Sequence, residues 1–205
     1  MVQQQLVPRG IRDPKILAAM EAIPRHEFIP TDARNMAYHD GPVSIGRGQT
    51  ISQPSIVAWM TELLGLRGVE RVLEIGAGCG YQTAILSRLA TQVCSLELDP
   101  DLCELALENL RRLNVHNVDL RIGNGFDRWP TGGDFDAILG ACAPLEVPEV
   151  LIDQLARGGR LVIPVGPTGQ NQELLCLYKT FDGKMIEEAR QAVRFVPMRE
   201  SHFLS

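Results

Sequence analysis

Three glycines at alternate positions, Gly76, Gly78 and Gly80, follow a short apolar run that contains one acidic residue, Glu74. Glycine adopts positive φ angles readily and lets a ligand approach the main chain closely. The residues after Gly80 carry apolar side chains at helical spacing, so the order indicates a buried strand, a tight turn and a helix start. Because the first N–H groups of a helix lack partners within it, this turn predicts a ligand site.

The glycine spacing separates two classes of nucleotide ligand. A dinucleotide site of the NAD type requires G-x-G-x-x-G, and Tyr81 stands where the last glycine would be. Glu74 lies inside an apolar strand, where a carboxylate is costly unless it has a partner such as an amino group. Glu97, near the end of the next apolar run, can accept hydrogen bonds from two ribose hydroxyls. Either acid alone could be a surface residue, but with the glycines they favour S-adenosylmethionine as the cofactor.

Strands and helices alternate from residue 71 onward. We expect strands at 71–75, 92–98, 118–122, 135–141 and 160–165, and helices at 80–90, 100–113 and 147–155. This alternation predicts an open, mostly parallel sheet with helices on both faces. Segments 174–179 and 192–196 flank a turn at 182–183 with no strong helix between them, which predicts an antiparallel end to the sheet.

Ligands of such sheets bind outside the carboxyl ends of the strands. This rule places residues 76–80, Glu97, Asn124 and the 140–144 loop around one crevice. Asn124 could accept a hydrogen bond from an adenine amino group, although Gly-Asn-Gly is also an ordinary turn, and both interpretations stay open.

The amino-terminal part precedes this alternating region. Asp13 and Pro14 predict a helix N-cap and first turn, and Pro24 ends that helix. Residues 24–50 are rich in glycine and proline, so we expect an irregular connection and consider 30–50 a candidate lid. Ser52 stands two residues before Pro54 and a helical apolar pattern, and this spacing favours an N-cap role for its hydroxyl. No G-x-S-x-G elbow surrounds it, which disfavours a hydrolase nucleophile.

Composition excludes several classes of protein. The 205 residues suit one domain, and the net charge of −5 with no basic run longer than two residues disfavours a nucleic-acid partner. The five cysteines show no C-x-x-C spacing and the four histidines lie far apart, so neither a disulfide framework nor a metal is expected. We expect a cytoplasmic protein with no membrane partner, because no apolar stretch reaches membrane length and the amino terminus lacks an apolar signal region.

Four segments of the sequence carry a resemblance to a known family, and they occur in the order found there: 48–54 (Gly-Gln-Thr-Ile-Ser-Gln-Pro), 72–76 (Val-Leu-Glu-Ile-Gly), 154–166 and 193–197 (Val-Arg-Phe-Val-Pro). Together they resemble the protein-L-isoaspartate O-methyltransferase family, and residues 9–13 and 23–28 resemble its amino-terminal segment. The resemblance implies a Rossmann-like class I S-adenosylmethionine-dependent methyltransferase fold, an α/β doubly wound, mostly parallel sheet with an antiparallel C-terminal end. We expect one methyltransferase domain over 1–205. It comprises an N-terminal helical and loop segment on the substrate side (1–55), a cofactor-binding core (56–166) and C-terminal strands (167–205).

The resemblance also assigns site residues. Ser52 would be the active-site serine and could still cap the helix, and Val196 would contact the substrate. The expected cofactor-binding residues are Thr50, Ile51, Gln53, Glu74, Gly76, Ala77, Gly78, Gly80, Glu97, Asn124 and Gly125. The chain departs from the family at Asn124, where aspartate is usual, and at Cys79, where serine is frequent.

The implied reaction is S-adenosylmethionine-dependent methylation of the α-carboxylate of L-isoaspartyl residues in damaged proteins and peptides, a repair reaction. That carboxylate is already ionised at neutral pH, so no general base is needed and positioning must supply the rate. One alternative is a carboxyl methyltransferase of the same fold that acts on a dedicated peptide or a small molecule. A second is a non-catalytic cofactor-binding module, and a nicotinamide oxidoreductase is disfavoured by Tyr81.

Overall fold

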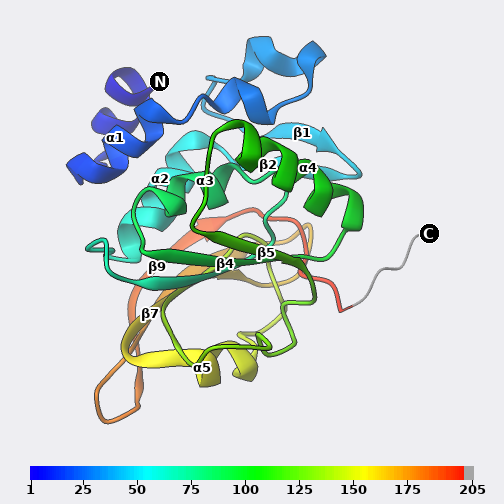
Figure 1. Cartoon of the computed structure of the whole chain (residues 1–205). Helices are drawn as coiled ribbons and strands as arrows, with labels where there is room; N and C mark the ends of the chain where they lie inside the picture. Colours follow the sequence, from blue (N-terminus) through cyan, green and yellow to red (C-terminus); the bar gives the residue numbers. More distant parts are fainter. Residues whose placement is uncertain (201–205) are drawn as a thin grey trace.

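The computed structural model describes residues 1–200, and its central layer is a seven-stranded sheet in the order β5-β4-β3-β6-β7-β8-β9 (Figure 1). The strands are β3 (Arg71–Ile75), β4 (Gln92–Glu97), β5 (Val118–Ile122), β6 (Phe135–Gly140), β7 (Leu155–Val165), β8 (Gln172–Lys179) and β9 (Met185–Val193). The pairs from β5 to β7 are parallel, whereas β8 and β9 pair antiparallel. The predicted mostly parallel sheet with an antiparallel carboxyl-terminal end is therefore confirmed.

Strand order reverses at β3, which pairs with β4 on one side and with β6 on the other. Successive side chains of a strand point to opposite faces of the sheet. Val72 accordingly packs in the core beneath α2 (Pro54–Leu63) and α3 (Tyr81–Ser87), while Leu73 and Ile75 pack on the α5 side. Glu74 shares the face of Val72. The carboxyl end of β3 is the switch point where a ligand crevice is expected.

Helices cover both faces of the sheet, as Figure 1 shows. Helices α2, α3 and α4 (Pro100–Arg112) lie on one side, and α5 (Glu149–Gln154) lies on the other. Asp99 is the N-cap of helix α4, and its carboxylate accepts hydrogen bonds from the backbone N–H groups of Asp101 and Leu102. Pro100 occupies the first turn, where its missing N–H group costs nothing. No helix within residues 1–200 is both long and apolar enough to cross a membrane.

The amino-terminal part corrects one expectation and confirms another. The predicted cap holds, because the Asp13 side chain accepts from the Lys15 N–H at the start of α1 (Pro14–Ala22). The short helices of this part are η1 (Val2–Leu6), η2 (Val7–Arg9), η3 (Arg25–Phe28) and η4 (Thr31–Met36). Residues 24–50 are not irregular throughout, since β1 (Val43–Gly46) and β2 (Gln49–Ile51) form an antiparallel hairpin. Its strands of four and three residues are too short to give a clear period-2 pattern.

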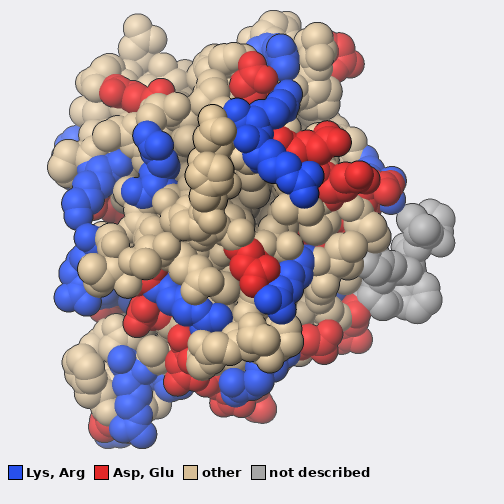
Figure 2. All heavy atoms as spheres, viewed as in Figure 1, with Lys and Arg blue, Asp and Glu red and all other residues tan. Residues whose placement is uncertain are grey.

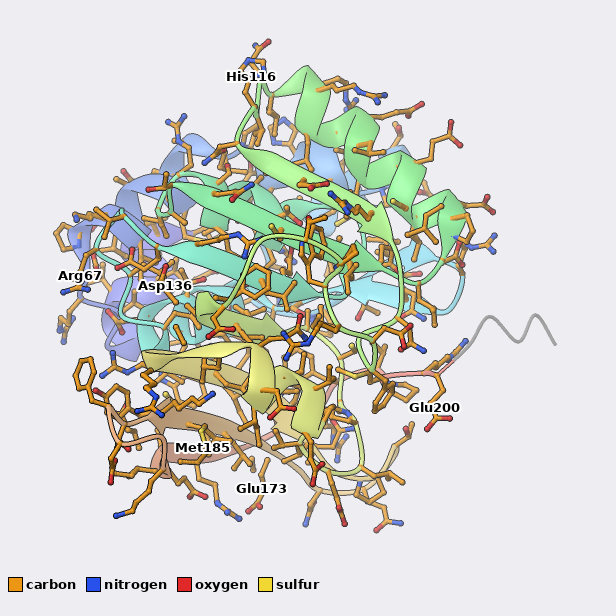
Figure 3. All side chains as sticks on the ribbon, turned by 60° about the horizontal axis from the view of Figure 1, so that its bottom comes forward. Arg67, His116, Asp136, Glu173, Met185 and Glu200 are labelled. Carbon is orange, nitrogen blue, oxygen red and sulfur yellow. The ribbon has the colours of Figure 1, made fainter. Side chains whose placement is uncertain are left out.

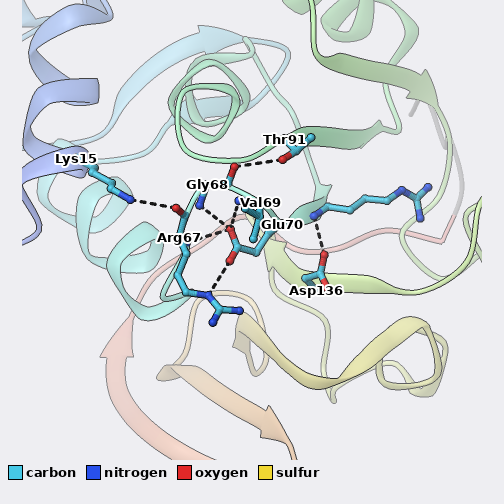
Figure 4. A network of polar contacts seen from close by, with 8 residues as sticks. Lys15, Arg67, Gly68, Val69, Glu70, Thr91 and Asp136 are labelled. Atoms are coloured by element: carbon cyan, nitrogen blue, oxygen red, sulfur yellow. Dashed lines mark hydrogen bonds and ion pairs between the residues drawn. The ribbon is translucent and has the colours of Figure 1, made fainter.

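A polar turn connects α2 to β3 at the end of the sheet where β3 begins (Figure 4). One oxygen of the Glu70 carboxylate accepts from the backbone N–H groups of Arg67, Gly68 and Val69. The Arg71 N–H then donates to Asp136 at 2.8 Å. Figure 3 shows Arg67 and Asp136 at one end of the sheet and Glu200 at the other. The first end carries this turn, and the second carries the cavity described below.

The two antiparallel strands differ from the predicted bounds. Strand β9 begins at Met185, opposite Lys179, rather than at residue 192. Most of its side chains are exposed, and the charged residues Glu187, Glu188 and Arg190 interrupt its apolar ones, which hides the strand from a search for apolar runs. The chain leaves the sheet after Val193, so residues 194–196 do not extend β9.

Candidate active site

A cavity of about 150 Å³ opens at the carboxyl ends of β3, β4 and β6. It is bordered by the loop after β3 (residues 76–80, called the glycine loop below), the end of β4, strand β2 and the segment after β9. Nine of the predicted site residues line it: Thr50, Ile51, Ser52, Gly76, Ala77, Gly78, Glu97, Gly125 and Val196. Segments more than 140 residues apart in the chain therefore meet at one hollow, where the switch-point rule predicts it.

The glycine loop is fastened to β4 by its backbone. The N–H groups of Gly76 and Ala77 donate to the Leu96 carbonyl at 2.8 and 3.2 Å. Gly76 and Gly78 have φ angles of +90° and +56°, which a side chain would strain. These conformations turn the chain sharply above the sheet and bring residues 76–79 to the border of the cavity.

Glu97 lies at the end of β4 and borders the same cavity. Its Oε2 atom accepts from the Gly78 N–H at 2.7 Å, and its Oε1 atom accepts from the Asp99 N–H at 3.0 Å. The residue is 7% exposed. Each carboxylate oxygen can accept more than one hydrogen bond, so both retain capacity for hydroxyl donors in the cavity.

Ser52 also borders the cavity, but it does not cap α2. The residue at the N-cap position is Gln53, and Pro54 begins the helix. The capping interpretation is therefore wrong by one residue, because a proline at the first helical position places the cap immediately before it. Ser52 instead continues from β2, which places Thr50, Ile51 and Ser52 together along the wall of the cavity.

Asp40 fixes the chain immediately after Ser52. Its carboxylate accepts from the Ser55 N–H at 3.0 Å, the Ser55 hydroxyl at 3.1 Å and the Gln53 side-chain amide at 3.0 Å. Arg9 adds an ion pair at 2.7 Å. Burial raises the pKa of Asp40, but these hydrogen bonds and the cation outweigh it and keep the pKa below its ordinary value.

Glu74 lies beneath the site and does not border the cavity. It is fully buried, and its Oε2 atom accepts from the hydroxyls of Thr83 and Ser95, each at 2.6 Å. Its Oε1 atom has no hydrogen-bond partner within residues 1–200. Burial raises the pKa of Glu74 to about 7, although the two hydroxyls act in the opposite direction. Contact between Glu74 and a cofactor stays a prediction.

Three other predicted residues, Gln53, Gly80 and Asn124, do not border the cavity. The side-chain amide of Gln53 donates to Asp40, as described above, and also to the Ser55 hydroxyl at 2.8 Å. Gly80 has a φ angle of +86°, and a Cβ atom there would lie 3.2 Å from the Cβ of Ala106, so glycine lets α3 and α4 pack closely. The Asn124 amide donates to the Glu200 carbonyl, and its oxygen accepts from the Phe126 N–H at 3.0 Å. Asn124 thus forms the ordinary turn that was one of its two interpretations, and its adenine contact stays a prediction.

A family model for protein-L-isoaspartate(D-aspartate) O-methyltransferase (PCMT) matches residues 1–202. The chain belongs to this family. Protein-L-isoaspartate O-methyltransferase 2 of Anaeromyxobacter sp. (strain Fw109-5) is 50% identical over 199 residues, which cover 97% of this chain and 82% of the relative. The enzyme of Picosynechococcus sp. (strain ATCC 27264 / PCC 7002 / PR-6) is 48% identical and is covered to 88%.

Solved structures of isoaspartate O-methyltransferases have the same fold as this chain. A Plasmodium falciparum protein assigned to the isoaspartate O-methyltransferases was crystallised in complex with S-adenosyl-L-homocysteine. It matches 97% of this chain and 96% of its own with a TM-score of 0.82 at 28% identity. A second protein-L-isoaspartate O-methyltransferase matches 96% of this chain and 65% of its own, also with a TM-score of 0.82, at 31% identity.

Several residues that border the cavity of this family member escaped prediction. Arg47, at the hairpin turn, pairs with Asp99 and reaches Asp101 at 2.7 Å, which ties the hairpin to the start of α4. Met198 and Arg199 also border the cavity, as does Cys142, which belongs to the 140–144 loop that was expected there. Asp99 had a visible signal, because it follows Glu97 and precedes a helix-starting proline. Arg47, Met198 and Arg199 lie in turns or loops whose course depends on the assembled sheet, and no local sequence pattern marks them.

Proposed function

We propose that this chain transfers the methyl group of S-adenosylmethionine to the α-carboxylate of L-isoaspartyl residues in proteins and peptides. The observation that carries the proposal is the meeting of Ser52, Glu97 and the glycine loop around one cavity. Full-length relatives at about 50% identity that are named for this reaction support the substrate class.

The residues fit the cofactor on features of this chain. Glu97 offers remaining acceptor capacity for ribose hydroxyls at the end of β4. Gly78 leaves space that a side chain would fill, since a Cβ atom there would lie 3.4 Å from Ile45. A Cβ atom at Gly76 would likewise lie 3.4 Å from the Cys142 Sγ atom. When bound, the cofactor supplies an electrophilic methyl group on a positively charged sulfur.

The chain's own residues would act by positioning. The acceptor carboxylate is ionised at neutral pH, so no side chain has to remove a proton from it. The Ser52 hydroxyl is assigned to donate a hydrogen bond that orients the carboxylate, and Val196 borders the acceptor. Alignment of two reacting groups in a water-poor site can contribute roughly 7–11 kcal/mol, which makes small displacements of this wall costly.

The face of the molecule drawn in Figure 2 agrees with a protein or peptide acceptor of no strong charge preference. Figure 2 shows lysine and arginine side chains interspersed with aspartate and glutamate over the visible face. A surface of this kind has no large single-sign field to select or repel a whole class of proteins. Selection would then depend on the cavity itself.

The proposal is tested with labelled cofactor and two peptides that differ only in an aspartyl or isoaspartyl linkage. Label is expected in the isoaspartyl peptide alone, with base-labile release as methanol, as for a methyl ester. Equal labelling of both peptides would refute the linkage specificity. Cofactor-induced thermal stabilisation with no label in either peptide would favour the non-catalytic binding module.

A further inference from the structure

The segment that follows β9 forms one wall of the cavity without belonging to a strand. Residues 195–199 all border the cavity, although β9 ends at Val193. A segment outside regular structure keeps its course only when its backbone N–H and C=O groups find other partners. Whatever supplies those partners therefore determines the shape of this wall.

Gln172 supplies both backbone partners of Phe195. Its Oε1 atom accepts from the Phe195 N–H at 2.5 Å, and its Nε2 atom donates to the Phe195 carbonyl at 3.2 Å. The residue is 1% exposed, so water cannot readily replace these bonds. Backbone pairing between β8 and β9 ends at Gln172 and Val193, and the side-chain amide then continues the pattern that a neighbouring strand would present.

The opposite edge of the segment is held by the loop after β6. The Ala143 N–H donates to the Val196 carbonyl, and the Met198 N–H donates to the Ala143 carbonyl, each at 2.8 Å. Residues 195–198 are thus held from two sides. On one side the partner is the loop after β6, which borders the cavity, and on the other side it is Gln172, which does not.

Gly166 packs closely against Gln172. It has a φ angle of +127°, and a Cβ atom there would lie 3.2 Å from the Cα of Gln172 and 3.5 Å from its Cγ. The Gly166 N–H donates to the Pro144 carbonyl at 2.9 Å. The turn after β7 therefore connects the loop after β6 with Gln172, and through Gln172 with Phe195.

We propose that Gln172 is a positioning residue for the acceptor. It acts through Phe195 on the course of residues 195–198 and so controls how well the isoaspartyl peptide binds, while the cofactor is held by the glycine loop and Glu97. This inference rests on the proposed function for the identity of the acceptor. Gln172 itself does not border the cavity.

Gln154 provides a matched control. It is also 1% exposed, and its amide also joins two backbone groups, accepting from the Trp129 N–H at 2.6 Å and donating to the Val150 carbonyl at 3.0 Å. Neither Gln154 nor its two partners border the cavity. A purely structural effect of losing a buried glutamine would therefore be the same at both positions.

The test compares Gln172→Ala with Gln154→Ala in steady-state kinetics and in calorimetry with S-adenosylhomocysteine. Gln172→Ala is expected to raise the KM for the isoaspartyl peptide at least fivefold while the Kd for S-adenosylhomocysteine changes less than twofold. Gln154→Ala is expected to lower the melting temperature and leave the peptide KM within twofold. A peptide KM within twofold in Gln172→Ala, or an equal rise in both variants, would overturn the proposal.

Gln172→Glu gives a second readout if the alanine variant does not fold. A protonated carboxyl group can accept from the Phe195 N–H and donate to its carbonyl, whereas the ionised group cannot donate. Because burial at this position raises the pKa of a carboxyl group, the peptide KM of Gln172→Glu, relative to the wild type, is expected to fall as the pH is lowered from 8 to 5. A ratio that does not change with pH would count against the positioning role.

A crystal structure of Gln172→Ala separates this inference from the proposed function. Residues 195–198 are expected to shift or lose order in the variant, whatever the acceptor. An unchanged course of these residues would overturn the inference. Absence of methyl transfer by the wild-type protein would instead refute the proposed function and leave the structural comparison intact.

Discussion

The Oε2 atom of Glu97 accepts a hydrogen bond from the Gly78 N–H at 2.7 Å, which fastens the end of β4 to the glycine loop after β3. One carboxylate thus shapes the loop and faces the cavity. Its other oxygen accepts from the Asp99 N–H, which begins α4. The proposed ribose contact and the shape of the glycine loop therefore depend on the same side chain.

Replacement of Glu97 should weaken cofactor binding strongly. Hydrogen bonds to a charged group contribute about 1.5–3 kcal/mol each, so Glu97→Ala should raise the Kd for S-adenosylhomocysteine by about 10- to 100-fold. Isothermal titration calorimetry measures this effect, with Glu108→Gln on the exposed side of α4 as the control. An unchanged Kd in Glu97→Ala would show that Glu97 does not bind the ribose.

Removal of the Ser52 hydroxyl should affect turnover more than cofactor affinity. We expect Ser52→Ala to lower kcat at least tenfold, because the acceptor carboxylate loses an orienting donor, while the Kd for S-adenosylhomocysteine stays within threefold. Ser87→Ala is a suitable control, since the Ser87 hydroxyl donates to the Ala84 carbonyl within its own helix and Ser87 does not border the cavity. Turnover within twofold of the wild type would remove Ser52 from the mechanism.

Glu74 should make stability fall as the pH rises. Burial raises its folded pKa to about 7 from the ordinary value of 4.5, so the folded state favours the protonated form. The contribution to stability is present below pH 4.5 and is lost as the pH rises through 7, in total about 3 kcal/mol. Glu74→Gln cannot titrate, so its unfolding free energy relative to the wild type should rise between pH 5 and pH 8.

Chemical denaturation of the two proteins across that pH range measures the difference, and titrations that they share cancel. Glu108→Gln, which changes an exposed glutamate, should show no such trend. A constant difference between Glu74→Gln and the wild type would mean that Glu74 stays ionised in the folded protein.

Asp40→Asn should damage both stability and turnover. The amide cannot accept from all the donors that the Asp40 carboxylate serves, and the ion pair with Arg9 is lost. Hydrogen bonds to a charged group contribute about 1.5–3 kcal/mol each, so their partial loss should lower the free energy of unfolding, and release of the chain after Ser52 should lower kcat several-fold. Because the folded pKa of Asp40 lies below its ordinary value, the stability loss should be full at pH 7 and diminish in acid.

Thermal unfolding and initial rates of Asp40→Asn can be compared with those of Asp32→Asn, a change at an exposed aspartate. If both variants retain wild-type turnover, Asp40 supports folding only and has no influence on the position of Ser52.

Local chemistry explains which parts of the fold could be predicted. The apolar β-branched run of β3 and the cap at Asp13 depend on neighbouring residues alone, and β3 and β5 match their predicted bounds. The hairpin strands β1 and β2 pair with each other, and β9, most of whose side chains are exposed, pairs with the preceding strand β8. No period in their own residues indicates those partners.

The residues of the site also divide into those that a local sequence pattern marks and those that it does not. The glycine loop and Glu97 could be recognised because a turn chemistry and a strand end mark them. Gln172 and Asp40 carry no such mark, since each acts through a hydrogen bond to a segment more than a dozen residues away. Glu74 shows the opposite case, because its acidic position within a strand was visible but its hydroxyl partners and its place beneath the cavity were not.

A crystal structure of the complex with S-adenosylhomocysteine tests the central claim most directly. We expect the ribose hydroxyls within hydrogen-bond distance of the Glu97 carboxylate, and the sulfur facing the part of the cavity that Ser52 borders. A nucleotide bound outside this cavity, or bound within it with its sulfur turned away from Ser52, would contradict the account.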